Sequence, residues 1–209
     1  MNKITFILSL LAGATAFSQQ KSSFFDEQIM GKTKAESPIQ LSLDAYPFLF
    51  LANGGGGTAS IEFRHWQVGM AGFSVVPPDY IVNTFFRQID TKTVTVRRNS
   101  GLEAFANYYL RPDRKGVYAG LLGGPEWFVM NKRQTDQQET LIKTYIVPRL
   151  GIRVFPVKKY VYADASLGWS FNLSGTESRT IGQSVYSASA GGFIYFLQIG
   201  ARFNLAKQR

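Results

Sequence analysis

The residues able to do acid–base or metal chemistry are few in this chain. Its 209 residues include one histidine, His65, and no cysteine. Without cysteine there is no disulfide, thiolate metal ligand or thiol nucleophile. One histidine leaves little room for a histidine-rich metal site. The sequence therefore predicts no catalytic residue, no cofactor-binding residue and no metal ligand.

Carboxylates and a glycine run are the remaining candidates for chemistry. Glu103, Glu126 and Asp164 could supply the acid pair of a glycoside hydrolase. They are spread over separate segments among arginines, which favours a structural ion-pair network instead. The run Gly54–Gly57 before Thr58 lacks the Lys-Ser/Thr pair of a phosphate-binding loop, and we interpret it as a flexible turn.

Composition places the chain among folded proteins with an anionic partner. It is 45% hydrophobic, 14% aromatic and 18% charged, which excludes a disordered chain. There are 23 Lys and Arg against 14 Asp and Glu, a net charge of +9. Such an excess indicates nucleic acid or a membrane surface as partner. A mean hydropathy of −0.07 argues, taken alone, against a membrane protein.

The N-terminus has the pattern of an export signal. A short basic start precedes the apolar run 4–17, and small residues lead up to a predicted cleavage site after Ser18. Residues 1–18 are thus expected to be a signal peptide, and residues 19–38 a short periplasmic segment. An exported chain without cysteine indicates a bacterial envelope protein, so no nucleic-acid partner is expected.

The rest of the chain alternates between apolar and polar residues. Over residues 160–174 one parity is apolar and the other is Tyr, Asp, Ser, Gly and Asn, a period of two that predicts a strand. Similar runs recur between longer polar connections. Working back from the C-terminus, strands are expected near 190–205, 159–174, 141–155, 115–130, 93–110, 66–75, 57–64 and 39–51.

Such strands form either a soluble barrel with an apolar interior or a transmembrane barrel with a polar one. The strands are long enough to cross a membrane, and their apolar face almost never carries a charge. The polar face balances acids against arginines and contains no lysine among the residues assigned to it. A confined interior favours arginine because its planar fork satisfies several acceptors. The predicted lumen ion-pair network is Asp44, Glu62, Arg64, Glu103, Arg111, Glu126, Arg149, Arg153, Asp164 and Arg202.

The sequence therefore predicts an all-β, transmembrane, antiparallel up-and-down barrel over residues 39–209, with about eight strands. Ten strands, or a plug made from part of residues 19–50, remain alternatives. Trp66, Trp127 and Trp169 are expected in interfacial aromatic belts. The apolar connection 76–92 either folds back on the barrel mouth or offers a binding surface.

The last strand resembles the C-terminal recognition signal of outer-membrane barrels. Its pattern rests on Gln198, Gly200, Phe203 and Leu205, although four residues follow in place of a terminal Phe. With the signal peptide and the strand pattern, the chain resembles the small outer-membrane barrels of Bacteroidota-type bacteria and, more broadly, the OmpA/OmpX-type architecture. The resemblance implies an outer-membrane location and insertion by the barrel-assembly machinery, without naming a function.

Three functions are compatible with these features. The first is a non-enzymatic barrel with a closed, ion-paired lumen and a structural or interaction role. Its partners would be outer-membrane lipids, including lipopolysaccharide, and an envelope protein. The second is a porin-like narrow pore for small solutes. The third is a lipid A-modifying barrel enzyme, for which His65 is the candidate residue, although beside Trp66 it is interpreted as an interfacial side chain.

Overall fold

The computed structural model describes most of the region expected to form the barrel. The described residues are 28–29, 38–80, 82, 94–133, 137–157, 160–175, 179–181, 184–186 and 191–205. The predicted signal peptide, its cleavage site and most of the predicted periplasmic segment lie outside them.

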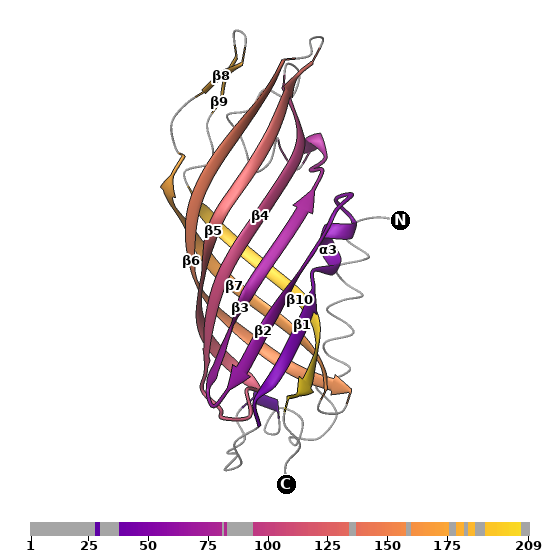
Figure 1. Cartoon of the computed structure of the whole chain (residues 1–209), viewed down its shortest axis with the longest axis vertical. Coiled ribbons are helices and arrows are strands. Elements are labelled where there is room, and N and C mark those ends of the chain that lie inside the picture. The colour runs from indigo at the N-terminus through magenta and orange to yellow at the C-terminus, as the bar shows by residue number, and fades with distance from the viewer. Residues whose placement is uncertain are drawn as a thin grey trace.

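Eight strands of the described chain close into one antiparallel barrel (Figure 1). Each strand pairs with its neighbours in chain order, and the first pairs with the last, Leu41 opposite Phe203. The strands are β1 Gln40–Ala45, β2 Gly55–Phe63, β3 Trp66–Val75, β4 Val94–Tyr109, β5 Gly116–Lys132, β6 Gln138–Val157, β7 Val161–Ser174 and β10 Gly192–Asn204. The predicted all-β, up-and-down fold with eight strands is confirmed.

Two short strands lie outside the barrel. β8, Arg179–Ile181, pairs with β9, Ser184–Tyr186, in a separate two-stranded sheet inside the last long connection. Neither strand joins the ring, so the alternative of a ten-stranded barrel is wrong.

The front of the barrel differs in detail from the sequence expectation. The first strand was expected over residues 39–51, but β1 ends at Ala45 and the short helix α3 covers Pro47–Phe50. Proline has no N–H for a sheet ladder and fits the first turn of a helix. Three of the four glycines expected in a turn, Gly55–Gly57, begin strand β2 instead. A Cβ on Gly57 would lie 2.2 Å from the carbonyl oxygen of Asp44, so the close pairing of β1 with β2 requires glycine there.

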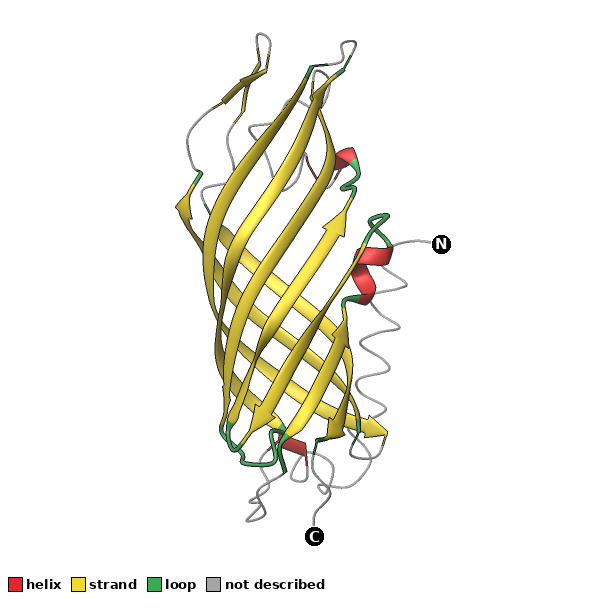
Figure 2. Cartoon of the chain, in the orientation of Figure 1, coloured by secondary structure: helices red, strands yellow, loops and turns green. Residues whose placement is uncertain are grey.

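The two ends of the barrel have different connections (Figure 2). At the lower end, which we call the short-turn end, residues 64–65, 110–115 and 158–160 join consecutive strands. At the upper end, the long-loop end, the connections cover residues 46–54, 76–93, 133–137 and 175–191. This alternation is the one expected for an up-and-down barrel whose chain enters and leaves at one end.

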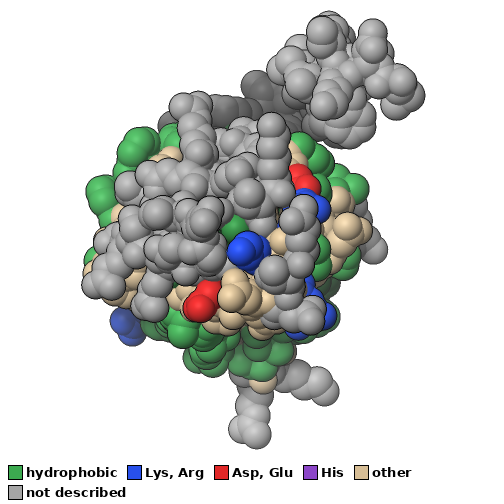
Figure 3. All heavy atoms as spheres, turned by 90° about the horizontal axis from the view of Figure 1, so that it is seen from above, with side chains coloured by type: hydrophobic (Ala, Val, Ile, Leu, Met, Phe, Trp, Pro, Cys, Tyr) green, Lys and Arg blue, Asp and Glu red, His purple; other side chains and the backbone are tan. Residues whose placement is uncertain are grey.

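Side chains alternate between the lumen and the outer face, and the outer face is apolar. On β1, Asp44 is 8% exposed and Leu43 is 48% exposed. On β7, Asp164 is buried and Leu167 is 50% exposed. Hydrophobic side chains surround the barrel when it is seen along its axis (Figure 3). A soluble barrel would show the reverse pattern.

The lumen has apolar layers as well as polar ones. Near its middle Tyr46, Phe105, Leu122, Tyr145 and Val147 pack with Ala71. At the long-loop end a second buried cluster joins Val82 to side chains of β4, β5 and β6, namely Val94, Val96, Phe128, Met130 and Leu141. At Val82, the connection 76–92 therefore folds back onto the barrel mouth, which is the first of its two expected roles.

Candidate functional site

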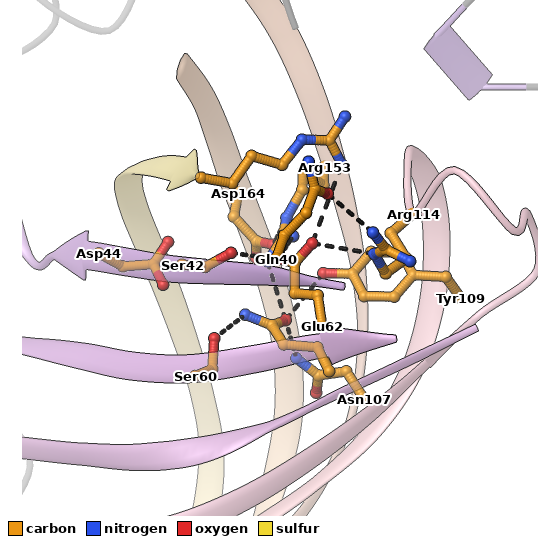
Figure 4. A network of polar contacts seen from close by, with 12 residues as sticks. Gln40, Ser42, Asp44, Ser60, Glu62, Asn107, Tyr109, Arg114, Arg153 and Asp164 are labelled. Atoms are coloured by element: carbon orange, nitrogen blue, oxygen red, sulfur yellow. Dashed lines mark hydrogen bonds and ion pairs between the residues drawn. The ribbon is translucent and has the colours of Figure 1, made fainter. Parts of the chain in front are cut away.

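Glu62 is the centre of a buried polar network near the short-turn end of the lumen (Figure 4). Its side chain is 0% exposed. Arg153 Nη1 donates to one carboxylate oxygen at 2.5 Å, and Arg114 Nε donates to the other at 3.0 Å. The Ser42 hydroxyl also donates to Glu62 at 2.5 Å, and Arg202 Nη1 lies 3.9 Å away. One carboxylate thus links strands β1, β2, β6 and β10 with the turn before β5.

Arg153 extends this network across the barrel. Its Nε donates to Asp164 at 3.2 Å and its Nη2 donates to Gln67 at 2.8 Å. The guanidinium carbon lies 4.0 Å from the ring centre of Tyr162. The side chain is 1% exposed, and each of its three guanidinium nitrogens donates to an acceptor inside the lumen.

Arg114 also belongs to this network, although it lies outside the strands and is absent from the predicted set of lumen residues. It lies in the turn between β4 and β5 with a φ of 55° and is 0% exposed. Its guanidinium also donates to the carbonyls of Arg64 and Pro38 and to Gln40 Oε1, at 2.8, 3.0 and 2.7 Å. The side chain thus reaches back from the turn and closes the lumen from below. Strand parity does not extend into turns, so it could not assign Arg114 to the lumen.

Asp44 and Arg149 occupy the next level of the lumen. Asp44 accepts a hydrogen bond from Thr58 at 2.5 Å. Arg149 donates to Asn107 at 3.1 Å, and its guanidinium lies 5.4 to 5.9 Å from the rings of Phe105, Tyr118 and Phe196. Aromatic faces stabilise a desolvated guanidinium through their quadrupole. Side chains from several strands therefore occupy this level of the lumen.

The carboxylates considered for catalysis each have a separate structural partner. Glu103 accepts from the Tyr145 hydroxyl. Glu126 forms an ion pair with Lys143 at 2.8 Å and accepts from Asn99 at 2.8 Å. Asp164 accepts from Tyr118 at 2.6 Å as well as from Arg153. Each carboxylate therefore has its own donors, as in a network that fills the interior.

The structure brings eight of the ten predicted network residues into the lumen and leaves two outside. Arg64 is exposed in the turn between β2 and β3, and Arg111 pairs with Asp113 at 2.8 Å in the turn before β5. Arg64 directly follows the end of β2 and Arg111 comes two residues after the end of β4, where alternation no longer sets the side-chain direction. A lysine that was not assigned to the polar face joins the lumen residues, because Lys143 is buried on Glu126.

Gly200, assigned above to the assembly signal, also has a packing role. A Cβ at this position would lie 2.1 Å from Asp44 Oδ1 and 2.5 Å from the Tyr162 ring. Gln198 is buried in the lumen, whereas Phe203 and Leu205 are 51% and 55% exposed on the outside. All four lie on or directly after β10, the strand that closes the ring against β1.

A Gly200→Ala variant is expected to be less stable by about 1–3 kcal/mol, because the added methyl group overpacks the lumen. Urea unfolding of the protein in vesicles, followed by tryptophan fluorescence, measures this change. Gly192→Ala is the matched control on the same strand, since a Cβ there has no atom within 4 Å. An equal loss of stability in both variants would contradict the packing role.

The predicted interfacial aromatics lie on the outer face. Trp66 is 42% exposed at the short-turn end, where its ring contacts Tyr108 with centroids 5.1 Å apart. Trp169 is 52% exposed and Trp127 is half-buried, both further along their strands. His65 stacks on Tyr108 at 5.3 Å, and its Nδ1 bonds to the carbonyl of Tyr109 at 2.8 Å. His65 therefore belongs to the turn and packs with Trp66 and Tyr108, a group that we call the aromatic girdle.

Neither metal sites nor helical membrane spans occur in the described ranges. No group of three or more His, Asp or Glu side chains there could hold a metal ion. No helix among those residues is long and apolar enough to cross a membrane.

Comparison with known proteins finds a similar solved structure. No family model and no curated protein matches the sequence. The crystal structure of the N-terminal β-barrel domain of Pseudomonas aeruginosa OprF is similar over 78% of this chain and 97% of that one. The sequence identity is 13% and the TM-score is 0.39. The conclusion that this chain forms a barrel therefore rests on its own strand pairing and not on this likeness.

Proposed function

We propose that the protein is a non-enzymatic outer-membrane β-barrel with a closed lumen, and that it has a structural or interaction role in the envelope of a Bacteroidota-type bacterium. The barrel-assembly machinery would insert it after cleavage behind Ser18. Its outer face would contact membrane lipids, and its long-loop end would be available to an envelope protein. The apolar outer face supports the membrane location, since water would not stabilise so many exposed leucines and aromatic rings.

The observation that carries the closed lumen is the burial of its charges. Glu62 and Arg114 are 0% exposed, and Arg153 is 1% exposed. A conducting pore would hydrate charged groups along its path, as in larger barrels with a water-filled interior. Here Glu62 and Asp164 accept from Arg114 and Arg153, and aromatic rings pack against the other buried guanidiniums. An eight-stranded barrel has an interior about wide enough for its own side chains.

The purified mature protein in planar lipid bilayers is expected to show no steady unitary openings, because no continuous water path crosses the ion-paired lumen. Insertion in the same preparation is checked by heat-modifiable migration on detergent gels. Steady openings from inserted protein would favour the narrow pore instead. A protein that stays soluble without detergent would contradict the membrane location itself.

The enzymatic alternative receives no support from the site. A lipid-modifying mechanism would need His65 hydrogen-bonded to a nucleophile such as a serine hydroxyl. One of its ring nitrogens bonds to the Tyr109 carbonyl and its face stacks on Tyr108. We therefore place the function of this barrel in its outer surface and its loops.

A further inference from the structure

Strand β4 contains a bulge near the long-loop end that changes the direction of its side chains. Val96 lies opposite Met130 and Arg98 lies opposite Val129, which leaves Arg97 as an extra residue. Val94 and Val96 are buried in the lumen, at 1% and 2% exposure. A bulge re-aims side chains in this way. As a result Arg97 and Arg98, although consecutive, are both exposed on the outside.

The two arginines border an open groove on the outer surface. Its volume is about 530 Å³, and it is lined by Val76, Arg97, Arg98, Val129 and Gln138. No acidic residue is among these, and within the described part of the chain neither guanidinium forms an ion pair. The side chains of two consecutive arginines and of two valines thus line a groove with a positive border and an apolar floor. Such a site suits a ligand that is anionic at one end and apolar at the other.

The height of the groove on the barrel matches a membrane boundary. Arg98 and Tyr108 lie on the same strand, 108 − 98 = 10 residues apart. With a rise of about 3.3 Å per residue and a tilt of about 40°, they are separated by about 25 Å along the barrel axis. This equals the apolar band of an outer-membrane barrel, about 25 Å tall. Tyr108 belongs to the aromatic girdle with Trp66, so Arg98 lies at the opposite interface.

An apolar track leads from the groove toward the middle of the membrane. Leu102 is 46% exposed on the outer face of β4, and Ala104 and Ala106 continue this face toward Tyr108. On the adjacent strand β5, Leu121 is also 46% exposed. An acyl chain could lie along these side chains while its headgroup remains beside the arginines.

From this arrangement we infer that Arg97 and Arg98 form a binding site for the phosphate of an outer-leaflet lipid headgroup. The inference rests on the proposed outer-membrane location and gives one lipid partner a specific site. Guanidiniums bind phosphate oxygens in bidentate fashion, and the bulge presents two of them to one headgroup. The valines and the track below the groove hold the lipid portion, which free phosphate lacks.

The test uses the mature protein in neutral detergent micelles, titrated with bisphosphorylated hexa-acyl lipid A and analysed by native mass spectrometry. The R97Q/R98Q variant is expected to bind this lipid about 30-fold more weakly, since each arginine beside an anionic headgroup contributes about fivefold. R97K/R98K should retain part of the affinity, because lysine keeps the charge but not the fork. Lipid A without phosphates should bind the unmodified protein as weakly as the double variant binds the phosphorylated lipid.

R64Q/R133Q is the matched control, because it also removes two positive charges from exposed positions, one in a short turn and one at the long-loop end. It should leave lipid A affinity within about twofold of the unmodified protein. Equal weakening in the two double variants would overturn the site in favour of general charge attraction. Full competition by millimolar inorganic phosphate would also overturn it, since the groove would then be an anion site and not a lipid site. Heat-modifiable migration, measured in parallel, separates a failed lipid site from a failed barrel.

Discussion

Replacing Glu62 by glutamine is expected to lower the free energy of unfolding by about 3–5 kcal/mol, because it leaves buried guanidiniums without their carboxylate. Arg153 and Arg114 both donate to Glu62, and Arg202 lies 3.9 Å from it. None of these four side chains is more than 3% exposed, so water cannot replace the lost charge. Reversible urea unfolding in lipid vesicles, followed by tryptophan fluorescence, measures the change.

Asp79→Asn is the control for this experiment. It removes the carboxylate of the Asp79–Arg133 ion pair, whose side chains are 49% and 42% exposed. An exposed pair contributes less than about 1 kcal/mol, since water solvates both partners once it is broken. If Glu62→Gln has no greater effect than Asp79→Asn, the Glu62 network does not stabilise the barrel.

Leu167→Arg is expected to destabilise the inserted barrel by about 2–4 kcal/mol, because in the proposed membrane location Leu167 would face lipid near the middle of the bilayer. Leu167 lies on β7 between Leu150 of β6 and Tyr195 of β10, and it is 50% exposed on the outer face. The free energy of unfolding in vesicles is measured as for Glu62→Gln. A soluble barrel would accept arginine at an exposed position with little loss.

Leu173→Arg provides a control on the same strand and the same face. Leu173 is 65% exposed and lies one residue before the end of β7. There an arginine side chain reaches the interface, and the expected effect is about 0–1 kcal/mol. Equal effects at the two positions would contradict a membrane around the barrel. A larger effect at Leu173 would mean that the middle of the membrane lies nearer Leu173 than Leu167.

These two predictions concern the two faces that the mean hydropathy of −0.07 averages together. Leu167 and its neighbours make the outer face apolar, and Glu62 with its arginines makes the lumen polar. A sum over the chain conceals this separation. The net charge of +9 shows a similar effect, because Glu62, Asp164, Arg114 and Arg153 compensate one another in the lumen while Arg97 and Arg98 lie outside.

Alternation alone was enough to predict the architecture and most of the lumen. Strand geometry sends successive side chains to opposite faces, so the parity of Asp164 and Leu167 assigned each to its face. The same rule, together with the turn and loop signals between the runs, predicted eight strands and placed Glu62, Arg153 and Asp44 on the inner face. These features are local, because each depends only on residues a few positions apart within one strand.

The tertiary structure decided the positions of side chains in turns and at bulges, which strand alternation does not predict. It brought Arg114 from a turn onto Glu62, 114 − 62 = 52 positions away, and excluded Arg64 from the lumen. It also placed a bulge in β4 that directs Arg97 and Arg98 to the same side. The physical reason is common to these cases. Turn conformations and bulges break the period of two, and the pairing partner across the barrel depends on strand register, which is a property of the closed ring.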